Sequence, residues 1–496
     1  MSIRTDWHDQ AQRLALPAQA LIDGQLVDAA DGRTLACTSP RDGRTLVEVA
    51  ACGEADVDAA VRAARRAFED GRWSRRAPAD RKAVLLEVAR LVEEHVDELA
   101  LLISLEMGKP ITLARNVEVP ALVKTLRWYA EAADKLVDGL PHVGSDVVAM
   151  VTREPVGVVG AIVPWNFPLT MAGWKLGPAL VMGNSVVLKP AEQSPLSALR
   201  VAELALEAGL PEGVLNVVPG RGPEAGQALG RHRDVDVLAF TGSGQTGAEL
   251  LRYAADSNLK RVYLELGGKT PNVVFADTAD LDAAAATAAW GVTFNQGEMC
   301  TAASRLLVQR DVHDDFVDKV LAAARAQPVG DPLDEATEIG PLVDDSQLRR
   351  VLGYVDVGRE EGAELVLGGG RTLEDTGGTF VEPTVFTGVA PSMRIAQEEI
   401  FGPVLGVLPF DDIDDAVSIA NDTVYGLAAS VWTDNLTTAH RVARAIRAGT
   451  VWVNCFEEGD LTVPFGGMKQ SGNGRDKSLH AIDKFTDLKT TWIELA

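Results

Sequence analysis

Two neighbouring stretches decide the fold: "VGVVGAIVPWNFPL", residues 156–169, and "GNSVVLKP", residues 183–190. Each contains a short apolar run rich in valine, which is typical of a strand buried on both faces of a parallel sheet. The prolines, glycines and asparagines between the two runs argue against a membrane span. We therefore expect a buried strand, a loop, a helix and a second buried strand.

The same alternation continues beyond these two strands. Ser194 as the N-cap and Pro195 in the first turn predict the start of a helix that ends at Gly209. Short apolar runs then alternate with helical stretches as far as "NVVF", residues 272–275. This order predicts a doubly wound α/β domain, in which helices cover both faces of a parallel sheet. A second α/β region is expected from about residue 270 to 465.

Length and charge limit the classes of function. At 496 residues the chain is too long for one hydrophobic core. Its net charge of -24 repels nucleic acid and anionic membrane surfaces, so neither partner is expected. The 4 cysteines form no CxxC pair, which argues against a metal site and fits a reducing cytoplasm. The N-terminal sequence lacks the pattern of a signal peptide, so a cytoplasmic location is expected.

A glycine-rich motif follows one of the predicted strands. "FTGSGQTG", residues 240–247, has GxGxxG spacing, and a plain dinucleotide-binding interpretation assigns the ribose to Glu265. Glu192, which stands beyond another buried strand and beside Lys189, competes for that role. If Glu192 holds the ribose, Glu265 is free for chemistry. In a chain with 46 glycines, a purely structural turn is the alternative.

Three side chains are candidates for catalysis. Cys300, in "NQGEMCTAAS", is either an inert buried thiol or a nucleophile. A cysteine hydrolase would need a histidine partner, and none of the 7 histidines lies in a glycine-rich motif. Glu265 ends an apolar strand, where it is either a general base or half of a salt bridge. Asn166 between two prolines either donates to an oxyanion or forms a simple turn.

The motifs resemble, in order and spacing, those of the NAD(P)-dependent aldehyde dehydrogenase superfamily from about residue 20 to the C-terminus. The motifs are "PWNFPL", "VVLKPAEQSP", "FTGSGQTG", "LELGGK", "NQGEMC", "EEIFGPV" and "PFGGMKQSGNGRD". The resemblance implies the aldehyde dehydrogenase fold: an α/β protein with a Rossmann-like parallel-sheet cofactor domain, an α/β catalytic domain and a small β oligomerisation domain. The expected ranges are 1–137 with 157–266, then 267–465, and finally 138–156 with 480–496.

The resemblance also implies a mechanism. Cys300 would attack the aldehyde carbonyl, and Asn166 with the backbone N–H of Cys300 would hold the oxyanion of the thiohemiacetal. After hydride transfer, Glu265 would activate the water that hydrolyses the thioester. Lys175 and Asp476 match positions implicated in a proton route away from that base.

NAD is the expected cofactor, with NADP possible but weaker, because a carboxylate at residue 192 would repel a 2′-phosphate. The family usually has threonine where this chain has Gly244, so the phosphate contact need not be that of a simple Rossmann motif. The residues implied for cofactor binding are Ile162, Trp165, Lys189, Glu192, Gly222, Gly242, Ser243, Gly247, Leu266, Glu399 and Phe401.

The substrate is expected to be a small aldehyde. The sequence is similar to family members of putrescine breakdown, which oxidise amino and amido aldehydes. The acidic stretch "EEGD", residues 457–460, suits a substrate with a cationic end, although a solvated acidic loop is the alternative. The residues implied for the substrate tunnel and its mouth are Phe167, Met171, Trp174, Phe294, Phe456, Glu457, Asp460 and Phe465.

Several alternatives stay open. A broad-specificity or betaine-type aldehyde dehydrogenase is the alternative within the class, and a coenzyme A-acylating enzyme is a further one. A catalytically silent structural or binding member belongs to a different class, but it would not need both Cys300 and Glu265. The strand-like segments before Gly157 and at the C-terminus match the family's oligomerisation strands, so a homo-oligomer, and specifically a tetramer, is expected.

Overall fold

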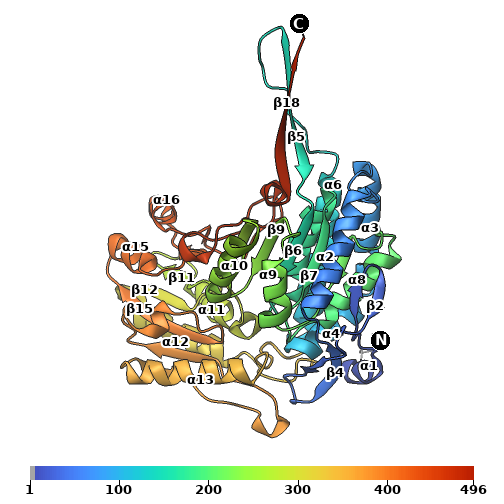
Figure 1. The fold of residues 1–496 in the computed structure, drawn as a ribbon. Helices are drawn as coiled ribbons and strands as arrows, with labels where there is room; N and C mark the ends of the chain where they lie inside the picture. Colours follow the sequence, from blue (N-terminus) through green and yellow to red (C-terminus); the bar gives the residue numbers. More distant parts are fainter. Residues whose placement is uncertain (1–5, 496) are drawn as a thin grey trace, which may run out of the picture.

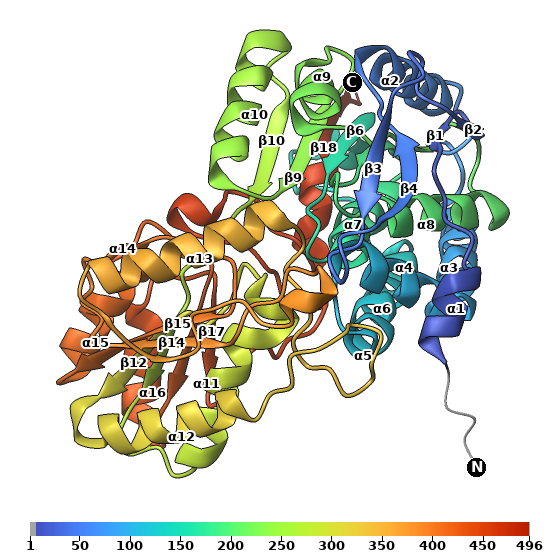
Figure 2. The same ribbon diagram turned by 90° about the horizontal axis from the view of Figure 1, so that it is seen from below.

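Two large sheets, each in its own lobe, form the body of the molecule. The structure is a computed structural model that describes residues 6–495, and within these residues both large sheets have seven strands. Figures 1 and 2 show the two lobes side by side, and Figure 1 shows a narrow arm projecting from the body. Residues 1–5 and Ala496, which fall in the predicted ranges 1–137 and 480–496, lie outside the described residues.

The first sheet is parallel through its first five strands and ends in an antiparallel edge. All residues of β6 and β7 are buried, as their apolar sequences predict. In order across the sheet, the strands are β10 (Arg261–Glu265), β9 (Val237–Thr241), β6 (Val158–Ile162), β7 (Ser185–Lys189), β8 (Leu215–Val217), β1 (Ala20–Ile22) and β2 (Gln25–Val27).

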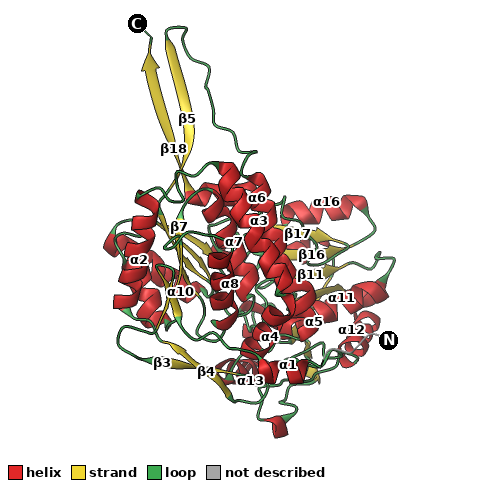
Figure 3. Ribbon diagram, turned by 90° about the vertical axis from the view of Figure 1, so that its right-hand side faces the viewer, coloured by secondary structure: helices red, strands yellow, loops and turns green. Residues whose placement is uncertain are grey.

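Helices cover both faces of this sheet, as Figure 3 shows for the face behind α7 and α8. One face packs against α2 (Glu54–Glu69), α9 (Gln227–Arg231) and α10 (Gly244–Ser257). The other packs against α3 (Pro78–Glu94), α4 (Val96–Met107), α6 (Val119–Ala132), α7 (Pro168–Val181) and α8 (Leu196–Glu207). The doubly wound α/β design is therefore confirmed.

The second sheet repeats this plan, with one antiparallel edge strand, β13. In order, its strands are β13 (Glu364–Leu367), β14 (Thr384–Thr387), β15 (Val404–Phe410), β12 (Arg305–Gln309), β11 (Pro271–Val274), β16 (Ala428–Trp432) and β17 (Thr450–Val453). Its flanking helices are α11 (Leu281–Thr293) and α12 (His313–Arg325) on one face, and α13 (Asp345–Glu360), α14 (Arg394–Gln397), α15 (Ile413–Asn421) and α16 (Leu436–Ala445) on the other.

The projecting arm is an antiparallel pair of β5 (Val147–Pro155) and β18 (Thr486–Glu494). Its tip carries the C-terminal end of the chain in Figure 1. Leu488 and Trp492 on β18 are 68% and 62% exposed, which is unusual for large apolar side chains. A separate hairpin joins β3 (Thr34–Thr38) to β4 (Thr45–Ala50).

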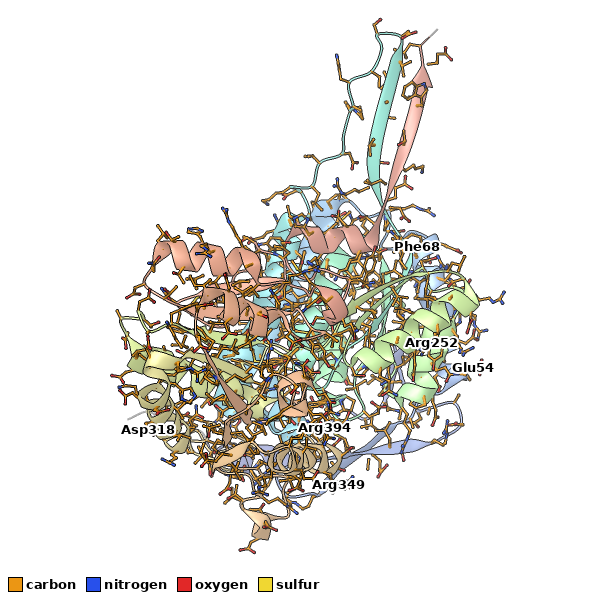
Figure 4. The ribbon with its side chains drawn as sticks, turned by 90° about the vertical axis from the view of Figure 1, so that its left-hand side faces the viewer. Glu54, Phe68, Arg252, Asp318, Arg349 and Arg394 are labelled. Atoms are coloured by element: carbon orange, nitrogen blue, oxygen red, sulfur yellow. The ribbon has the colours of Figure 1, made fainter. Side chains whose placement is uncertain are left out.

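The shorter segments are α1 (Trp7–Arg13), α5 (Ile111–Leu113), η1 (Ala114–Glu118), η2 (Gly222–Gly226), η3 (Phe294–Gly297), η4 (Arg310–Val312), η5 (Glu374–Thr376), η6 (Lys469–Ser471) and η7 (Leu479–Phe485). In the part of the chain that the structure describes, no helix combines the length and apolar character needed to cross a membrane. Charged side chains lie on the outer helices; Figure 4 labels Glu54, Arg252 and Arg349 on α2, α10 and α13.

One predicted helix cap is wrong. Ser194 was expected to cap the helix that follows it, but the carboxylate of Glu106 does so instead, accepting from the N–H groups of Leu196 and Ser197 at 2.6 and 3.3 Å. Glu106 lies at the end of α4, so this cap is a long-range contact that local sequence does not reveal. The domain boundaries given above stay predictions.

Candidate active site

The two lobes meet at a cavity of about 290 Å³. The first lobe contributes the segments that follow β6, β9 and β10, because the carboxyl ends of parallel strands lie at the same edge of a sheet. The second lobe contributes Cys300 and residues of two further segments. The lining residues are Pro164, Trp165, Asn166, Phe167, Met171, Thr241, Gly242, Ser243, Glu265, Leu266, Gly267, Cys300, Gln347, Arg350, Glu399 and Phe401.

The loop that carries Cys300 has an unusual backbone. Directly after α11, Asn295, Gln296 and Gly297 all have positive φ, at 51°, 59° and 72°. Non-glycine residues in this region cost about 1–3 kcal/mol each unless surrounding contacts hold them, and such residues cluster at functional sites. A Cβ at Gly268 would collide with the carbonyl of Cys300, so the glycine allows the loop to approach the end of the first sheet.

The surroundings of Cys300 favour its thiol form in the protein alone. The pKa of the Cys300 thiol is raised by burial first, and then by the nearby carboxylates of Glu457, Glu399 and Glu265. A nucleophilic role therefore requires that the proton leaves during the reaction.

Asn166 is held in place by three hydrogen bonds, two to the second lobe and one to Lys109, which follows α4. Its Nδ2 donates to the carbonyl of Glu298 at 2.9 Å. Its own carbonyl accepts from Asn295 Nδ2 at 3.2 Å and from Lys109 Nζ at 2.9 Å. A primary amide carries two N–H donors, so Asn166 keeps a second donor for a ligand in the cavity.

A buried ion pair between Lys109 and Glu118 also holds the segment that carries Asn166. Lys109 pairs with Glu118, and Glu118 Oε1 accepts from the N–H groups of Leu169 and Thr170, each at 3.1 Å. Because those N–H groups belong to the first turn of α7, the carboxylate satisfies donors that the helix itself cannot. Lys109 and Glu118 thus fix the segment from Asn166 to Thr170, and no motif pointed to either residue.

Glu265 is a buried carboxylate with spare acceptors. It is the last residue of β10, and within residues 6–495 neither side-chain oxygen has a hydrogen-bond partner. Burial and the neighbouring Asp476 raise its pKa to about 8, while Lys175, Lys484 and Arg475 act in the opposite direction. A carboxylate with such a pKa is suited to accept a proton near neutral pH.

Asp476 lies behind Glu265 and stays ionised. Burial would raise its pKa, but the ammonium groups of Lys175 and Lys484 outweigh burial and hold the pKa below its ordinary value. Each ammonium binds a different oxygen of the carboxylate. Lys175 and Asp476 were predicted together, whereas Lys484 was not.

A second, larger hollow of about 670 Å³ contains Glu192. Glu192 Oε1 accepts from the N–H of Gly222 at 2.5 Å, and Oε2 lies 3.5 Å from Lys189 Nζ. Burial alone would raise the pKa of Glu192, but Lys189 and backbone donors lower it overall, so it stays a carboxylate. This pair has the chemistry to bind the hydroxyl groups of a ribose.

The helix α10 begins at the main cavity, which Gly242 and Ser243 line. Ser243 caps the helix, its Oγ accepting from the N–H of Thr246 at 3.3 Å. A 14-residue helix offers unpaired N–H groups to an anion at this end, as a pyrophosphate requires. Among the described residues, a Cβ at Gly244 would meet no heavy atom within 4 Å, so the GxGxxG spacing is not required sterically at that position.

Glu399 and Phe401 lie across the cavity from this helix. Glu399 Oε1 accepts from the N–H of Gly268 at 3.1 Å, and burial raises its pKa to about 7. The rings of Phe401 and Trp165 meet edge to face at 5.3 Å. Their segment is held by two residues that the sequence did not indicate: Gln347 donates to the carbonyl of Phe401 and Arg350 to that of Glu399, both at 2.5 Å.

Some of the predicted site residues line neither the main cavity nor the hollow that contains Glu192. Ile162 is 8% exposed at the end of β6, and Gly247 faces Leu266, where a Cβ would come within 3.0 Å of its side chain. Predicted residues outside both linings are Ile162, Lys175, Lys189, Gly222, Gly247, Trp174, Phe294, Phe456, Glu457, Asp460, Phe465 and Asp476.

The predicted tunnel residues form aromatic pairs. Phe167 stacks on Phe294 at 6.3 Å, and Trp174 lies 5.1 Å from Phe465. Phe167 also lines the main cavity, so the aromatic groups extend outward from it. Trp290, which contacts both Phe294 and Phe456 and was not predicted, belongs to the same group.

Two acidic residues of the loop 457–460 differ in burial. Asp460 is exposed and lies 3.3 Å from Lys124. Glu457, by contrast, has a buried Oε1 with no hydrogen-bond partner in the described part of the chain, and burial raises its pKa to about 7. Glu457 is also first among the charged groups that raise the pKa of Cys300, so the two lie close together.

Comparisons with known proteins agree with the fold. Residues 26–491 match the model of the aldehyde dehydrogenase family. An aminoacetaldehyde dehydrogenase of Pseudomonas aeruginosa is 53% identical over 99% of this chain and 98% of its own length. The chain therefore belongs to the aldehyde dehydrogenase family.

Two solved structures are also similar. A gamma-glutamyl-gamma-aminobutyraldehyde dehydrogenase from Burkholderia cenocepacia is 59% identical, with a TM-score of 0.97 and 99% of both chains covered. An indole-3-acetaldehyde dehydrogenase in complex with NAD+ is 58% identical, with a TM-score of 0.98 and the same coverage. The predicted family and enzyme class are thus confirmed.

The buried thiol leads to a first prediction. In the protein without cofactor, alkylation of Cys300 by iodoacetamide should accelerate from pH 7 to pH 10 without levelling off, because burial and carboxylates raise the thiol pKa above its ordinary 9.0. Mass spectrometry of the Cys300 peptide measures the rate at each pH, and the unfolded chain serves as the control. A plateau below pH 8 would show that the thiolate is already formed.

Proposed function

We propose that the protein oxidises aldehydes to carboxylic acids with NAD, through a covalent intermediate on Cys300. The observation that carries this proposal is that Cys300, Asn166 and Glu265 line one cavity. A nucleophile, an oxyanion donor and a base within one space are the groups that acyl transfer and hydrolysis require. Membership in the family supports the same reaction class.

In the first half of the reaction, the Cys300 thiol gives its proton to water and its sulfur bonds to the aldehyde carbon. The oxygen becomes an oxyanion, which Asn166 Nδ2 and the backbone N–H of Cys300 stabilise. The C–H bond then breaks with its electron pair, and the thioester forms. NAD, when bound, would supply the acceptor for that hydride.

In the second half, Glu265 takes a proton from water. The water oxygen bonds to the acyl carbon, the C–S bond breaks, and the acid leaves as Cys300 is restored. The raised pKa of Glu265, about 8, supports its role as the base. The buried Lys175–Asp476 pair supports a route by which the proton moves away.

The residues around the second hollow support NAD rather than NADP. A carboxylate at Glu192, held by Gly222 and Lys189, binds ribose hydroxyls and repels a 2′-phosphate. The similar indole-3-acetaldehyde dehydrogenase was crystallised with NAD+.

The first test measures NADH or NADPH formation with propanal. Wild-type enzyme should favour NAD and release the free acid, and Cys300→Ala should be inactive. Asn166→Ala should lower kcat by about 10²–10³, because one oxyanion donor is lost.

A Cys300-independent rate would contradict the covalent mechanism. Formation of acyl-CoA in place of the free acid, with coenzyme A added, would indicate the acylating alternative. A complete lack of activity would favour the silent-member alternative.

Amino and amido aldehydes, such as gamma-glutamyl-gamma-aminobutyraldehyde, are the proposed substrates. The aminoacetaldehyde and gamma-glutamyl-gamma-aminobutyraldehyde enzymes among the similar proteins support this class. So does Glu457, whose buried, unpaired Oε1 lies close to Cys300 and is suited to bind an ammonium or amide donor. Putrescine breakdown would supply such aldehydes.

A broad-specificity or betaine-type enzyme is the second candidate. The aromatic pairs Phe167–Phe294 and Trp174–Phe465 favour apolar or aromatic aldehydes as well. The similar indole-3-acetaldehyde dehydrogenase supports that possibility. A panel must therefore include aminated, amidated, quaternary, aliphatic and indole aldehydes.

Replacement of Glu457 separates the two candidates. Glu457→Gln should lower kcat/KM for 4-aminobutanal by about tenfold, with little change for hexanal, because only the aminated substrate loses an ionic partner. The ratio should be measured at pH 8, where a carboxyl with a pKa of about 7 is mostly ionised. Asp460→Asn, which removes an exposed acid paired with Lys124, is the control. Equal losses for both aldehydes in Glu457→Gln would refute a selective role.

We also propose that the protein assembles into a tetramer in the cytoplasm through its projecting arm. Exposed Leu488 and Trp492 on β18 support a surface that a second copy covers. The four cysteines, which are all free, support a reducing compartment.

Light scattering tests the assembly. A Leu488→Asp/Trp492→Asp double variant should have a smaller mass than the wild type, because buried charges would oppose the contact. Leu436→Asp on α16, at a position that is 73% exposed, is the matched control and should leave the mass unchanged. An unchanged mass in the arm variant would exclude the arm from the interface.

A further inference from the structure

Two buried lysines bind Asp476 near Glu265, and only one of them, Lys175, has a role in the proposed reaction. Lys175 on α7 and Lys484 on η7 each donate to a different oxygen of Asp476. The three side chains are 1%, 5% and 0% exposed. Asp476 itself is fixed by its backbone, which pairs with Phe465 in both directions, at 2.7 and 2.8 Å.

The charges in this cluster do not balance without Glu265. Burial lowers the pKa of Lys175 and Asp476 acts in the opposite direction. With both lysines charged, two ammonium groups and one carboxylate leave one positive charge in a buried region. A buried charge is costly unless an opposite charge lies near it. Glu265, which faces the cluster from β10, supplies that charge when it is ionised.

The other polar groups near this cluster do not remove the imbalance. Arg475 adds a half-buried cation that donates to the carbonyls of Gly467 and Gly474. Tyr129 on α6 is neutral, and its hydroxyl donates to the carbonyl of Ser478. On the cavity side, Glu265 faces Cys300. Because Arg475 is only half-buried, water screens part of its charge, and the fully buried charges are those of Glu265, Asp476 and the two lysines.

We propose that Lys484 is a positioning residue for thioester hydrolysis: it holds Asp476 and supplies the positive charge that allows Glu265 to act as a carboxylate base beside it. This inference rests on the proposed function. Without Lys484, Lys175 and Asp476 would form a neutral pair, and an ionised Glu265 would be a second carboxylate next to the first. Like charges at such a distance disfavour ionisation.

The charged groups near Glu265 shift its pKa in the directions that this arrangement requires. Asp476 raises the pKa of Glu265, whereas Lys175 and Lys484 lower it. Removal of the Lys484 charge should therefore raise the pKa of Glu265 further. Because Glu265 must be deprotonated to accept a proton from water, the hydrolysis rate would then rise only at a higher pH.

Acyl-enzyme hydrolysis can be followed directly with p-nitrophenyl acetate and without NAD. The Cys300 sulfur bonds to the acetyl carbon as the C–O bond breaks, and p-nitrophenolate leaves in a burst. Water then bonds to the acetyl carbon, its proton passes to Glu265, and the C–S bond breaks to release acetate. The decay of acetyl-Cys300 is measured by intact mass from pH 5.5 to 10.

Three substitutions at Lys484 separate charge from packing. Lys484→Gln and Lys484→Met remove the charge, and both should shift the rising limb of the hydrolysis profile upward by about one pH unit or more, with a slower decay at pH 7. Lys484→Arg keeps the charge and should keep the limb close to that of the wild type. Lys260→Met, at another buried lysine whose Nζ donates to the carbonyl of Gly230, is the control.

The outcomes distinguish this inference from the proposed function. An absent burst in the wild type would contradict acylation of Cys300, and with it the proposed function. A normal burst with an unmoved limb in Lys484→Gln and Lys484→Met would overturn the role of Lys484 and leave the proposed function intact. A slower decay with no change in the limb would indicate packing alone. If one neutral variant does not fold, the other gives the same test.

Discussion

The amide of Asn295 is the contact on which the site depends. Its Nδ2 donates to the carbonyls of Asn166 and Glu298, and so ties the loop of the second lobe to the loop that follows β6 in the first. The candidate nucleophile comes from one lobe and the candidate oxyanion donor from the other. Neither lobe alone forms the cavity, so the strained backbone at Asn295 and Gln296 is maintained by a contact that also builds the site.

A second constraint is the burial of several acids around one thiol. Glu265, Glu399 and Glu457 have raised pKa values of about 8, 7 and 7, and burial is the main cause for each. Near neutral pH, small changes in their surroundings alter their charge. Asp476 behaves differently because two ammonium groups hold it ionised. The site thus combines a fixed charge with carboxyl groups that exchange protons, as acid–base catalysis needs.

The sequence predicted the features that short segments determine by themselves, such as buried strands. The valine-rich runs at Val158 and Ser185 predicted buried strands because a strand covered on both faces is apolar throughout. The motif resemblance then identified Cys300, Glu265 and Asn166, which line one cavity. Those assignments came from ordered motifs and not from any periodicity.

Contacts between distant segments could not be predicted in that way. Glu118 caps α7 from a position 51 residues earlier, and Lys484 meets Lys175 only through Asp476. Gln347 and Arg350 hold the Glu399 segment from an ordinary surface helix. Each of these residues has a sequence context typical of a solvated helix or turn, and its partner is defined only by the fold.

The electrostatics of the site connect substrate choice with reactivity. Glu457 opposes ionisation of Cys300. In the proposed reaction, an ammonium group bound to Glu457 would neutralise that carboxylate and remove part of the opposition, whereas an aliphatic aldehyde would leave it in place. A cationic substrate would therefore gain from Glu457 twice, in binding and in formation of the thiolate. An aromatic aldehyde would gain only from contact with Phe167 and its neighbours, so in this proposal selectivity between the two classes would depend on the charge state of one buried carboxyl.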